Sequence, residues 1–302
     1  MIWRIAGVAI VAVLALAFAQ RLFLAPAPRP PAATARFASS PPAPPSPARC
    51  QSSPRYAAAA GANAASSVTA QWSAFGRPEL GWQVYAPLIA HELGLACPPQ
   101  SQAFAAALAA WQGVHRLPAN GEMDEATLRA FDIAWLRRRP FVAAAAHGQC
   151  PAPPPPADLA TAQPSEGYLG KSVQLRPAAL GAYRRMVAAA RAESPAIAAD
   201  PKLLTIFSGY RDPAADAADC ASKGDCDTPA RAGTCSAHRT GLAMDLYLGS
   251  APGHPPGSAA DVNRLYESRT PAYLWLVANA GRFGFTPYPF EPWHWEWTSE
   301  RP

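Results

Sequence analysis

Two short stretches in the C-terminal half of the chain carry residues that could hold a metal ion. Residues 236–245 read SAHRTGLAMD, and residues 291–295 read EPWHW. His238, Asp245 and His294 supply two imidazoles and one carboxylate, a set that suits a catalytic zinc ion with one open coordination position. Because a lone histidine is ordinarily a structural residue of the core, the prediction of a metal site depends on all three occurring together.

The residues around this set predict the strands that must position it. Gly241 allows a sharp turn, and apolar residues alternate over 242–248, so that Asp245 points away from the Leu/Met face of a strand. Residues 203–207, LLTIF, predict a buried strand, and residues 292–297 predict a last strand rich in tryptophan.

Two helices are expected beside these strands. Apolar residues at helical spacing follow Pro177, and proline is favoured in the first turn of a helix. A second helix is expected to open at Thr270 and to close at Gly281, since glycine is common just after the last helical turn. Helices and strands do not alternate regularly, which favours an α+β fold with an antiparallel sheet and flanking helices.

Four blocks of this region resemble the VanY-type zinc D-Ala-D-Ala carboxypeptidases, whose wider fold group includes lysostaphin-type peptidases and hedgehog signalling domains. The blocks are the two metal-binding stretches, SGYR at residues 208–211 and WLVANAGRFGF at residues 275–285. They occur in order over about residues 168–297. The resemblance implies a zinc metallopeptidase domain, placed at residues 166–302, that hydrolyses the terminal D-Ala-D-Ala bond of peptidoglycan stem peptides.

The resemblance also implies a role for individual residues. His238, Asp245 and His294 correspond to the zinc ligands of the family. Glu291 corresponds to the general base, and Arg211 to the group that binds the scissile carbonyl. Further residues of the same motifs are expected to contact the substrate or support the ligands: Ser208, Tyr210 and Ser236.

The choice of the base leaves one alternative. On a regular strand Glu291 and His294 would face opposite sides of the sheet, whereas Glu296 would share the side of His294. Pro292 can interrupt the strand and leave Glu291 in a bend. We therefore expect Glu291 to be the base and keep Glu296 as the alternative.

Two other functions fit these residues. An endopeptidase of the same fold would need a groove open at both ends, whereas a carboxypeptidase must pair the free carboxylate of its substrate. A non-catalytic wall-binding protein would need neither Glu291 nor a complete ligand set, and the sequence contains both.

The N-terminal residues predict export to the periplasm or cell envelope. Residues 1–24 form either a cleaved signal peptide or an inner-membrane anchor over residues 5–24, because an apolar run follows a short basic start. We expect membrane contact through this segment only.

A net charge of +5 without a long Lys/Arg run argues against nucleic-acid binding. The protein is expected to be a monomer.

The rest of the chain divides by composition. Residues 25–70 and 151–165 are rich in alanine or proline and predict linkers. Between them, residues 71–150 predict a small three-helix domain, with FAAALAAWQ at residues 104–112 on one helix and Asp124 as the cap of another. This stretch resembles the peptidoglycan-binding domain found beside many wall hydrolases, and both wall binding and a spacer role stay open.

The cysteines fit an oxidising compartment, but their pairing does not follow from the sequence. Three of them lie close together, where a disulfide with one leftover thiol is favoured over a zinc–thiolate site because paired C-x-x-C spacing is lacking. One of the others lies in the first predicted linker, and two bracket the helical domain. The six are Cys50, Cys97, Cys150, Cys220, Cys226 and Cys235.

Overall fold

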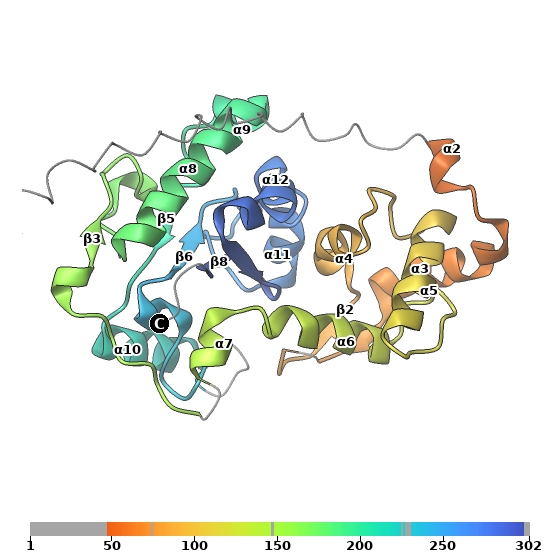
Figure 1. The fold of residues 1–302 in the computed structure, drawn as a ribbon, viewed down its shortest axis with the longest axis horizontal. Coiled ribbons are helices and arrows are strands. Elements are labelled where there is room, and N and C mark those ends of the chain that lie inside the picture. The colour runs from red at the N-terminus through yellow and green to blue at the C-terminus, as the bar shows by residue number, and fades with distance from the viewer. Residues whose placement is uncertain (1–46, 74, 146–147, 225, 227–230, 299–302) are drawn as a thin grey trace, which may run out of the picture. The chain divides into compact units, whose positions relative to one another are not determined.

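The computed structural model describes residues 47–298 except positions 74, 146–147, 225 and 227–230 (Figure 1). The predicted signal peptide or anchor and residues 25–46 of the first predicted linker lie outside the described residues. Within the described part of the chain, no helix combines the length and the apolar character needed to cross a bilayer.

A four-stranded sheet and the turn that leads into it carry the two stretches with the candidate metal ligands. Its strands are β5 (Ile206–Ser208), β6 (Ala243–Leu246), β7 (Phe285–Tyr288) and β8 (Glu291–Trp297), in the spatial order β5-β6-β8-β7. Every neighbouring pair is antiparallel. Two small antiparallel pairs complete the sheets: β1 (Gln71–Trp72) with β2 (Glu79–Leu80), and β3 (Ala160–Thr161) with β4 (Gln174–Leu175). This mixture of helices and antiparallel sheets agrees with the predicted α+β class.

The central position of β6 explains its sequence. Met244 and Leu246 are fully buried in the hydrophobic core, as the alternation predicted. Asp245 faces the other side but is only 4% exposed, so this side of the strand is not a solvated surface. A buried carboxylate needs partners to offset its desolvation, which the site described below provides.

The described residues after the second predicted linker form five α-helices in addition to the sheet. They are α8 (Pro177–Glu193), α9 (Pro195–Ala199), α10 (Pro213–Lys223), α11 (Asp261–Glu267) and α12 (Pro271–Asn279). Pro177 opens α8, and Thr270 caps α12 by accepting a hydrogen bond from the Tyr273 amide, both as predicted. The expected end at Gly281 is wrong. The chain continues as a 3-10 turn, η6 (Ala280–Phe283), and Gly284 takes the left-handed conformation, with φ of 83°.

The described residues before the second predicted linker form more helices than the three that were expected over residues 71–150. The described residues form α2 (Pro47–Cys50), α3 (Ala57–Thr69), α4 (Ala86–Glu92), α5 (Gln102–Val114), α6 (Glu125–Leu136) and α7 (Pro140–Ala144). Asp124 caps α6 as predicted, since its side chain accepts a hydrogen bond from the Thr127 amide at 2.7 Å.

The C-terminal part of the linker predicted over residues 25–70 is helical, because α3 occupies residues 57–69. Alanine is the best helix former, and a run of alanines is a weak signal for a linker once a packing partner exists. Ala59 and Ala60 pack against Ala105 of α5. Asn63 donates to the Gly121 carbonyl at 2.9 Å and accepts from the Met123 amide at 2.7 Å, which fixes α3 against the turn before α6.

All six cysteines lie among the described residues and are paired. The predicted local disulfide forms within the trio, but its third member pairs with a distant cysteine and leaves no free thiol. Cys50, predicted to lie in a linker, is buried and forms a disulfide with Cys97, which follows α4. The pairs are Cys220–Cys226, Cys150–Cys235 and Cys50–Cys97.

The N-terminal helices and the region that contains the four-stranded sheet share one hydrophobic core, which runs from Trp72 to Trp297. A buried ion pair joins them where Arg264 Nη1 of α11 donates to Glu79 Oε2 of β2 at 2.8 Å. Phe75 stacks on Tyr85 and packs against Phe290, with ring centroids 5.5 and 5.4 Å apart. The residues predicted as two separate domains, 71–150 and 166–302, therefore pack directly against each other.

Candidate metal centre and active site

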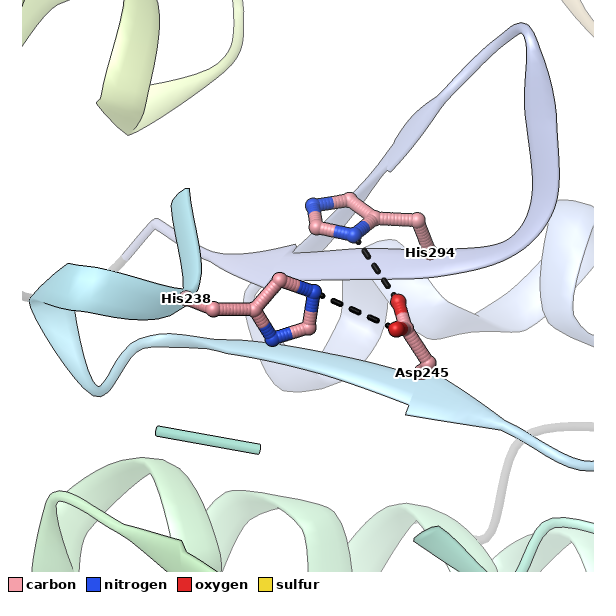
Figure 2. Close-up of side chains that lie close together, drawn as sticks. All are labelled: His238, Asp245 and His294. Atoms are coloured by element: carbon pink, nitrogen blue, oxygen red, sulfur yellow. Dashed lines mark hydrogen bonds and ion pairs between the residues drawn. The ribbon is translucent and has the colours of Figure 1, made fainter. Parts of the chain in front are cut away.

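His238, Asp245 and His294 converge in the structure, and their candidate ligand atoms all lie within 4.8 Å of one another (Figure 2). His238 Nε2 is 3.2 Å from Asp245 Oδ2, and His294 Nδ1 is 2.9 Å from Asp245 Oδ1. Zinc bonds of about 2.0–2.2 Å in tetrahedral geometry separate ligand atoms by about 3.3 Å. The spacing and the donor types therefore fit one shared ion.

The sheet register brings these side chains together. Asp245 on β6 lies opposite His294 on β8 and opposite Ser208 on β5. His238 reaches the same place from a 3-10 turn, η5 (Ala237–Thr240), that leads into β6. Gly241 makes the connection with φ of 70°, a conformation that favours glycine. The short spacing between His238 and Asp245 thus reflects a tight turn before a strand.

Hydrogen bonds at the second nitrogen of each ring orient both imidazoles. His238 Nδ1 donates to the Gly209 carbonyl oxygen at 2.8 Å, which directs Nε2 toward Asp245. His294 Nε2 lies 3.3 Å from Glu296 Oε1, which directs Nδ1 toward Asp245. Metal-ligating histidines usually donate their second ring N–H to a carbonyl or a carboxylate in this way. Both rings are therefore set in the orientation that a metal site requires.

Glu291 reaches the site because β8 is irregular. Its Oε2 lies 3.9 Å from His294 Nδ1, and its side chain lines the cavity over the metal-binding set. In the pairing with β7, Pro287 lies opposite Trp295, but the next residue, Tyr288, lies opposite Glu291. The register shift allows Glu291 and His294 to face the same cavity, and it occurs where Pro292 predicted a break.

Glu296, the alternative base, lies behind the site. Its side chain is buried, and Oε1 accepts a hydrogen bond from Arg139 Nε at 2.6 Å. Its second oxygen, Oε2, accepts from the Phe141 amide at 3.1 Å. Both of its oxygens are therefore occupied, and it contacts His294 at Nε2, the ring nitrogen that points away from Asp245. Glu296 is thus placed to orient His294 rather than to accept a proton from water.

The surroundings of the two imidazoles shift their pKa values in opposite directions. Burial and the charge of Arg211 lower the pKa of His238 to about 4. Burial also disfavours the charged form of His294, but hydrogen bonds from its ring to Asp245 and Glu296 outweigh this and raise its pKa to about 9. The pKa of Glu291 is raised, chiefly by burial and further by the charge of Asp245. A raised carboxyl pKa suits a group that must accept a proton and return it near neutral pH.

Arg211 lies at the edge of the metal-binding set. Its Nη2 is 3.6 Å from Asp245 Oδ2 and 3.2 Å from Ser208 Oγ, and its Nη1 is 2.7 Å from Asp219 Oδ2. The guanidinium is thus held from two sides and faces the cavity. Ser208, predicted as a substrate contact, lines the cavity and accepts a hydrogen bond from this arginine.

The other two predicted substrate contacts have different surroundings. Tyr210 is half-buried and lines the cavity, and its backbone amide donates to the Gln174 carbonyl at 2.8 Å. Ser236 also lines the cavity, but its hydroxyl and its amide both donate to the buried Asp216, at 2.6 and 2.7 Å. Ser236 therefore anchors the start of η5, from which His238 extends, to α10.

The carboxylates of α10 were not predicted as part of the site. Asp216 and Asp219 face Arg231, whose nitrogens lie 3.2 and 2.6 Å from their oxygens, and Asp219 also holds Arg211. Asp212 caps this helix through hydrogen bonds to two amides. The spacing of 212, 216 and 219 could have predicted this arrangement. An aspartate at 212 predicts the start of a helix, and residues 216 and 219 then lie on one face of it.

The cavity has a volume of about 950 Å³ and combines the metal-binding set with several cations. Pockets of this size hold ligands as large as a short peptide. Most of the lining comes from residues 171–294, but Phe75, Gly76, Arg77 and Arg139 come from the N-terminal part of the chain. The remaining basic side chains that line it are Lys171, Arg211, Lys223 and Arg231.

The site lies within a region that matches a known family. Residues 172–300 match the family model VanY, described as D-alanyl-D-alanine carboxypeptidase. No curated protein matches the chain. The matched residues include the three members of the metal-binding set together with Glu291 and Arg211. Residues 172–300 of this chain thus form a domain of the VanY family of D-alanyl-D-alanine carboxypeptidases, a family of peptidases.

Proposed function

We propose that this protein is a zinc-dependent D-alanyl-D-alanine carboxypeptidase that removes the terminal D-alanine from peptidoglycan stem peptides. One observation supports this most strongly. His238, Asp245 and His294 meet at ligand distance in a cavity that also contains Glu291 and Arg211, inside a region that matches a carboxypeptidase family.

Zinc is the metal that the donor set favours. Two imidazole nitrogens and one carboxylate make a three-ligand site of the kind that catalytic zinc uses, with the fourth position open to water or substrate. Hydrogen bonds orient both histidines, and Asp245 is buried between them. When bound, the ion would polarise the scissile carbonyl as a Lewis acid and lower the pKa of a water molecule.

The side chains of the chain then account for proton transfer and charge stabilisation. Glu291 takes a proton from the attacking water and passes it to the nitrogen of the departing D-alanine. Its raised pKa favours uptake of the proton from water. Arg211 faces the cavity beside Asp245 and stabilises the negative charge that develops on the carbonyl oxygen.

A free carboxylate on the substrate fits the charge of the cavity. Lys171, Lys223 and Arg231 line it in addition to Arg211. Cations at a peptide-binding cavity favour a substrate that ends in a carboxylate over one that continues through the site. This supports carboxypeptidase action.

We also propose that the protein acts outside the cytoplasm, in the periplasm or cell envelope. Its stem-peptide substrate would be located there, and three disulfides fit an oxidising compartment. The apolar segment at residues 5–18 would supply export.

The decisive experiment is mass spectrometry of products from a stem pentapeptide that ends in D-Ala-D-Ala. We expect release of a single D-alanine, its loss after chelation, and its return with added zinc. A cross-linked peptide dimer serves as the second substrate, and the Glu291→Gln variant serves as the control for contaminating activity. Cleavage of the dimer alone would identify an endopeptidase, and zinc binding without any cleavage would leave a wall-binding protein.

A further inference from the structure

A buried arginine from the N-terminal part of the chain reaches the back of the metal centre. Arg139 directly precedes α7 and is only 1% exposed. Its Nε and Nη2 both lie 2.6 Å from Glu296 Oε1. The guanidinium carbon also lies 4.1 Å from the ring centroid of Tyr288. Arg139 is therefore fixed by both an ion pair and an aromatic face.

The same carboxylate oxygen contacts a metal-binding histidine. Glu296 Oε1 lies 3.3 Å from His294 Nε2, so Arg139 and His294 share one acceptor atom. The other oxygen, Oε2, accepts from the Phe141 amide at 3.1 Å. Residues 139 and 141 thus hold both oxygens of the carboxylate that contacts His294.

The burial of these groups strengthens the arrangement. The side chains of Arg139 and Glu296 are 1% and 2% exposed, and that of His294 is 5% exposed. In surroundings of low polarity, charged hydrogen bonds are stronger and alternative positions for a carboxylate are costly. Without the arginine, Glu296 would be a buried charge left with the His294 ring and the Phe141 amide as its hydrogen-bond partners.

We propose that Arg139 is a positioning residue of the metal centre, which acts through Glu296 to hold His294 in its metal-binding orientation. The inference rests on the proposed function in one respect, that His294 is a metal ligand. Mutation of residues that hold a metal ligand in place typically weakens metal binding by about tenfold to a hundredfold. The peptidase region would then need residues 139–141 to reach its full affinity for zinc.

A second buried arginine offers a matched control. Arg264 pairs with Glu79 at 2.8 Å, and their side chains are 1% and 3% exposed. This pair also joins the N-terminal part of the chain to the peptidase region. Among the described residues, neither of its members has a hydrogen bond or ion pair with His238, Asp245 or His294. Loss of Arg264 should therefore reproduce the cost to folding of a broken buried ion pair without the effect on the metal.

The test compares the full-length protein with its Arg139→Met, Arg139→Gln, Arg139→Lys and Arg264→Met variants. Zinc affinity is measured by competition with a chromophoric chelator, and ligand geometry by the visible absorption of the cobalt-substituted protein. We expect Arg139→Met to bind zinc about tenfold to a hundredfold more weakly, with an altered cobalt spectrum. Arg139→Lys should restore part of the affinity, and Arg264→Met should lower Tm but keep wild-type affinity and spectrum.

Several outcomes would overturn the inference. It fails if folded Arg139→Met keeps both the affinity and the cobalt spectrum of the wild type, or if Arg264→Met loses as much affinity as Arg139→Met. Should Arg139→Met not fold, Arg139→Gln decides, because an unchanged affinity and spectrum in that variant, which lacks the charge, contradict a positioning role. Absence of zinc binding by the wild type itself would overturn the proposed function, which distinguishes the two failures.

Discussion

The peptidase sheet and the N-terminal helices contribute to the site in different ways. Strands β6 and β8 and the turn before β6 supply all three members of the metal-binding set, within two short motifs. The N-terminal part supplies part of the cavity wall, through Phe75 and Arg77, and a buried arginine behind His294. The groups proposed to do the chemistry are thus concentrated in the motifs, whereas their support comes from distant segments.

The largest expected effect separates the two glutamates of β8. Glu291→Gln should lower kcat by about 10²–10⁴, because it removes the proton acceptor over the site. Zinc content should stay at the wild-type level, since Glu291 is not a member of the metal-binding set. Steady-state kinetics and metal analysis of the same preparation check this.

Glu296→Gln is the matched variant on the same strand. It should chiefly weaken zinc binding, and excess zinc should restore much of its activity. The opposite result, with Glu296→Gln inactive at saturating zinc and Glu291→Gln active, would assign the role of base to Glu296.

Arg211→Met is expected to rank next. Loss of one group that stabilises the oxyanion costs about 10²–10³ in kcat. Arg211 also lies 2.7 Å from Asp219, so an Asp219→Asn variant tests whether the position of the guanidinium matters as well as its presence. Asp219→Asn should lower kcat by less than Arg211→Met. Equal kcat in Arg211→Met and wild type would remove Arg211 from the mechanism.

Gly209→Ala should weaken the site from the side of His238. A Cβ at this position would overlap Val173 and would lie 2.6 Å from the Gln174 carbonyl oxygen, so the backbone must shift. The Gly209 carbonyl that orients His238 would move with it, and we expect about tenfold to a hundredfold weaker zinc binding. Competition titration measures the change.

The control for this glycine is Gly181→Ala in α8. The nearest atom to an added Cβ there is 3.7 Å away, which is an ordinary contact, and alanine favours the helix. Its zinc affinity should equal that of the wild type. A Gly209→Ala protein that also keeps full affinity would show that the carbonyl contact is dispensable.

The smallest expected effect concerns stability rather than catalysis. Glu267 on α11 is buried, and burial raises its pKa to about 8 although Asn263 donates to it at 3.1 Å. The unfolded chain ionises this group near pH 4.3. Its contribution to stability is therefore fully present below that pH and is lost as the pH rises toward 8.

Glu267→Gln mimics the protonated carboxyl and should remove this dependence. We expect the variant to have a Tm close to the wild type at pH 4 and a Tm several degrees higher at pH 8. Thermal unfolding across this range measures the difference. An equal change in Tm at both values would show that the carboxyl is ionised in the folded protein at neutral pH.

The amino-acid sequence by itself determined the chemical groups of the site. His238, Asp245 and His294 were predicted as ligands from motifs of a few residues, because metal binding needs specific atoms at specific positions and substitutes are few. The turn at Gly241, the strand that carries Asp245 and the caps at Asp124 and Thr270 also follow from short spacings. Local geometry decides such features, so local sequence reveals them.

Only the tertiary structure decided the contacts between segments far apart in the chain. The register shift that turns Glu291 toward the cavity depends on the pairing of β8 with β7. The pairing of Arg139 with Glu296 joins residues separated by 157 positions, and the Gly209 carbonyl meets His238 across 29. The alanine-rich stretch at 57–69 is a helix because α5 gives it a surface to pack on. Such contacts form between surfaces that exist only after folding, and residue spacing along the chain carries no record of them.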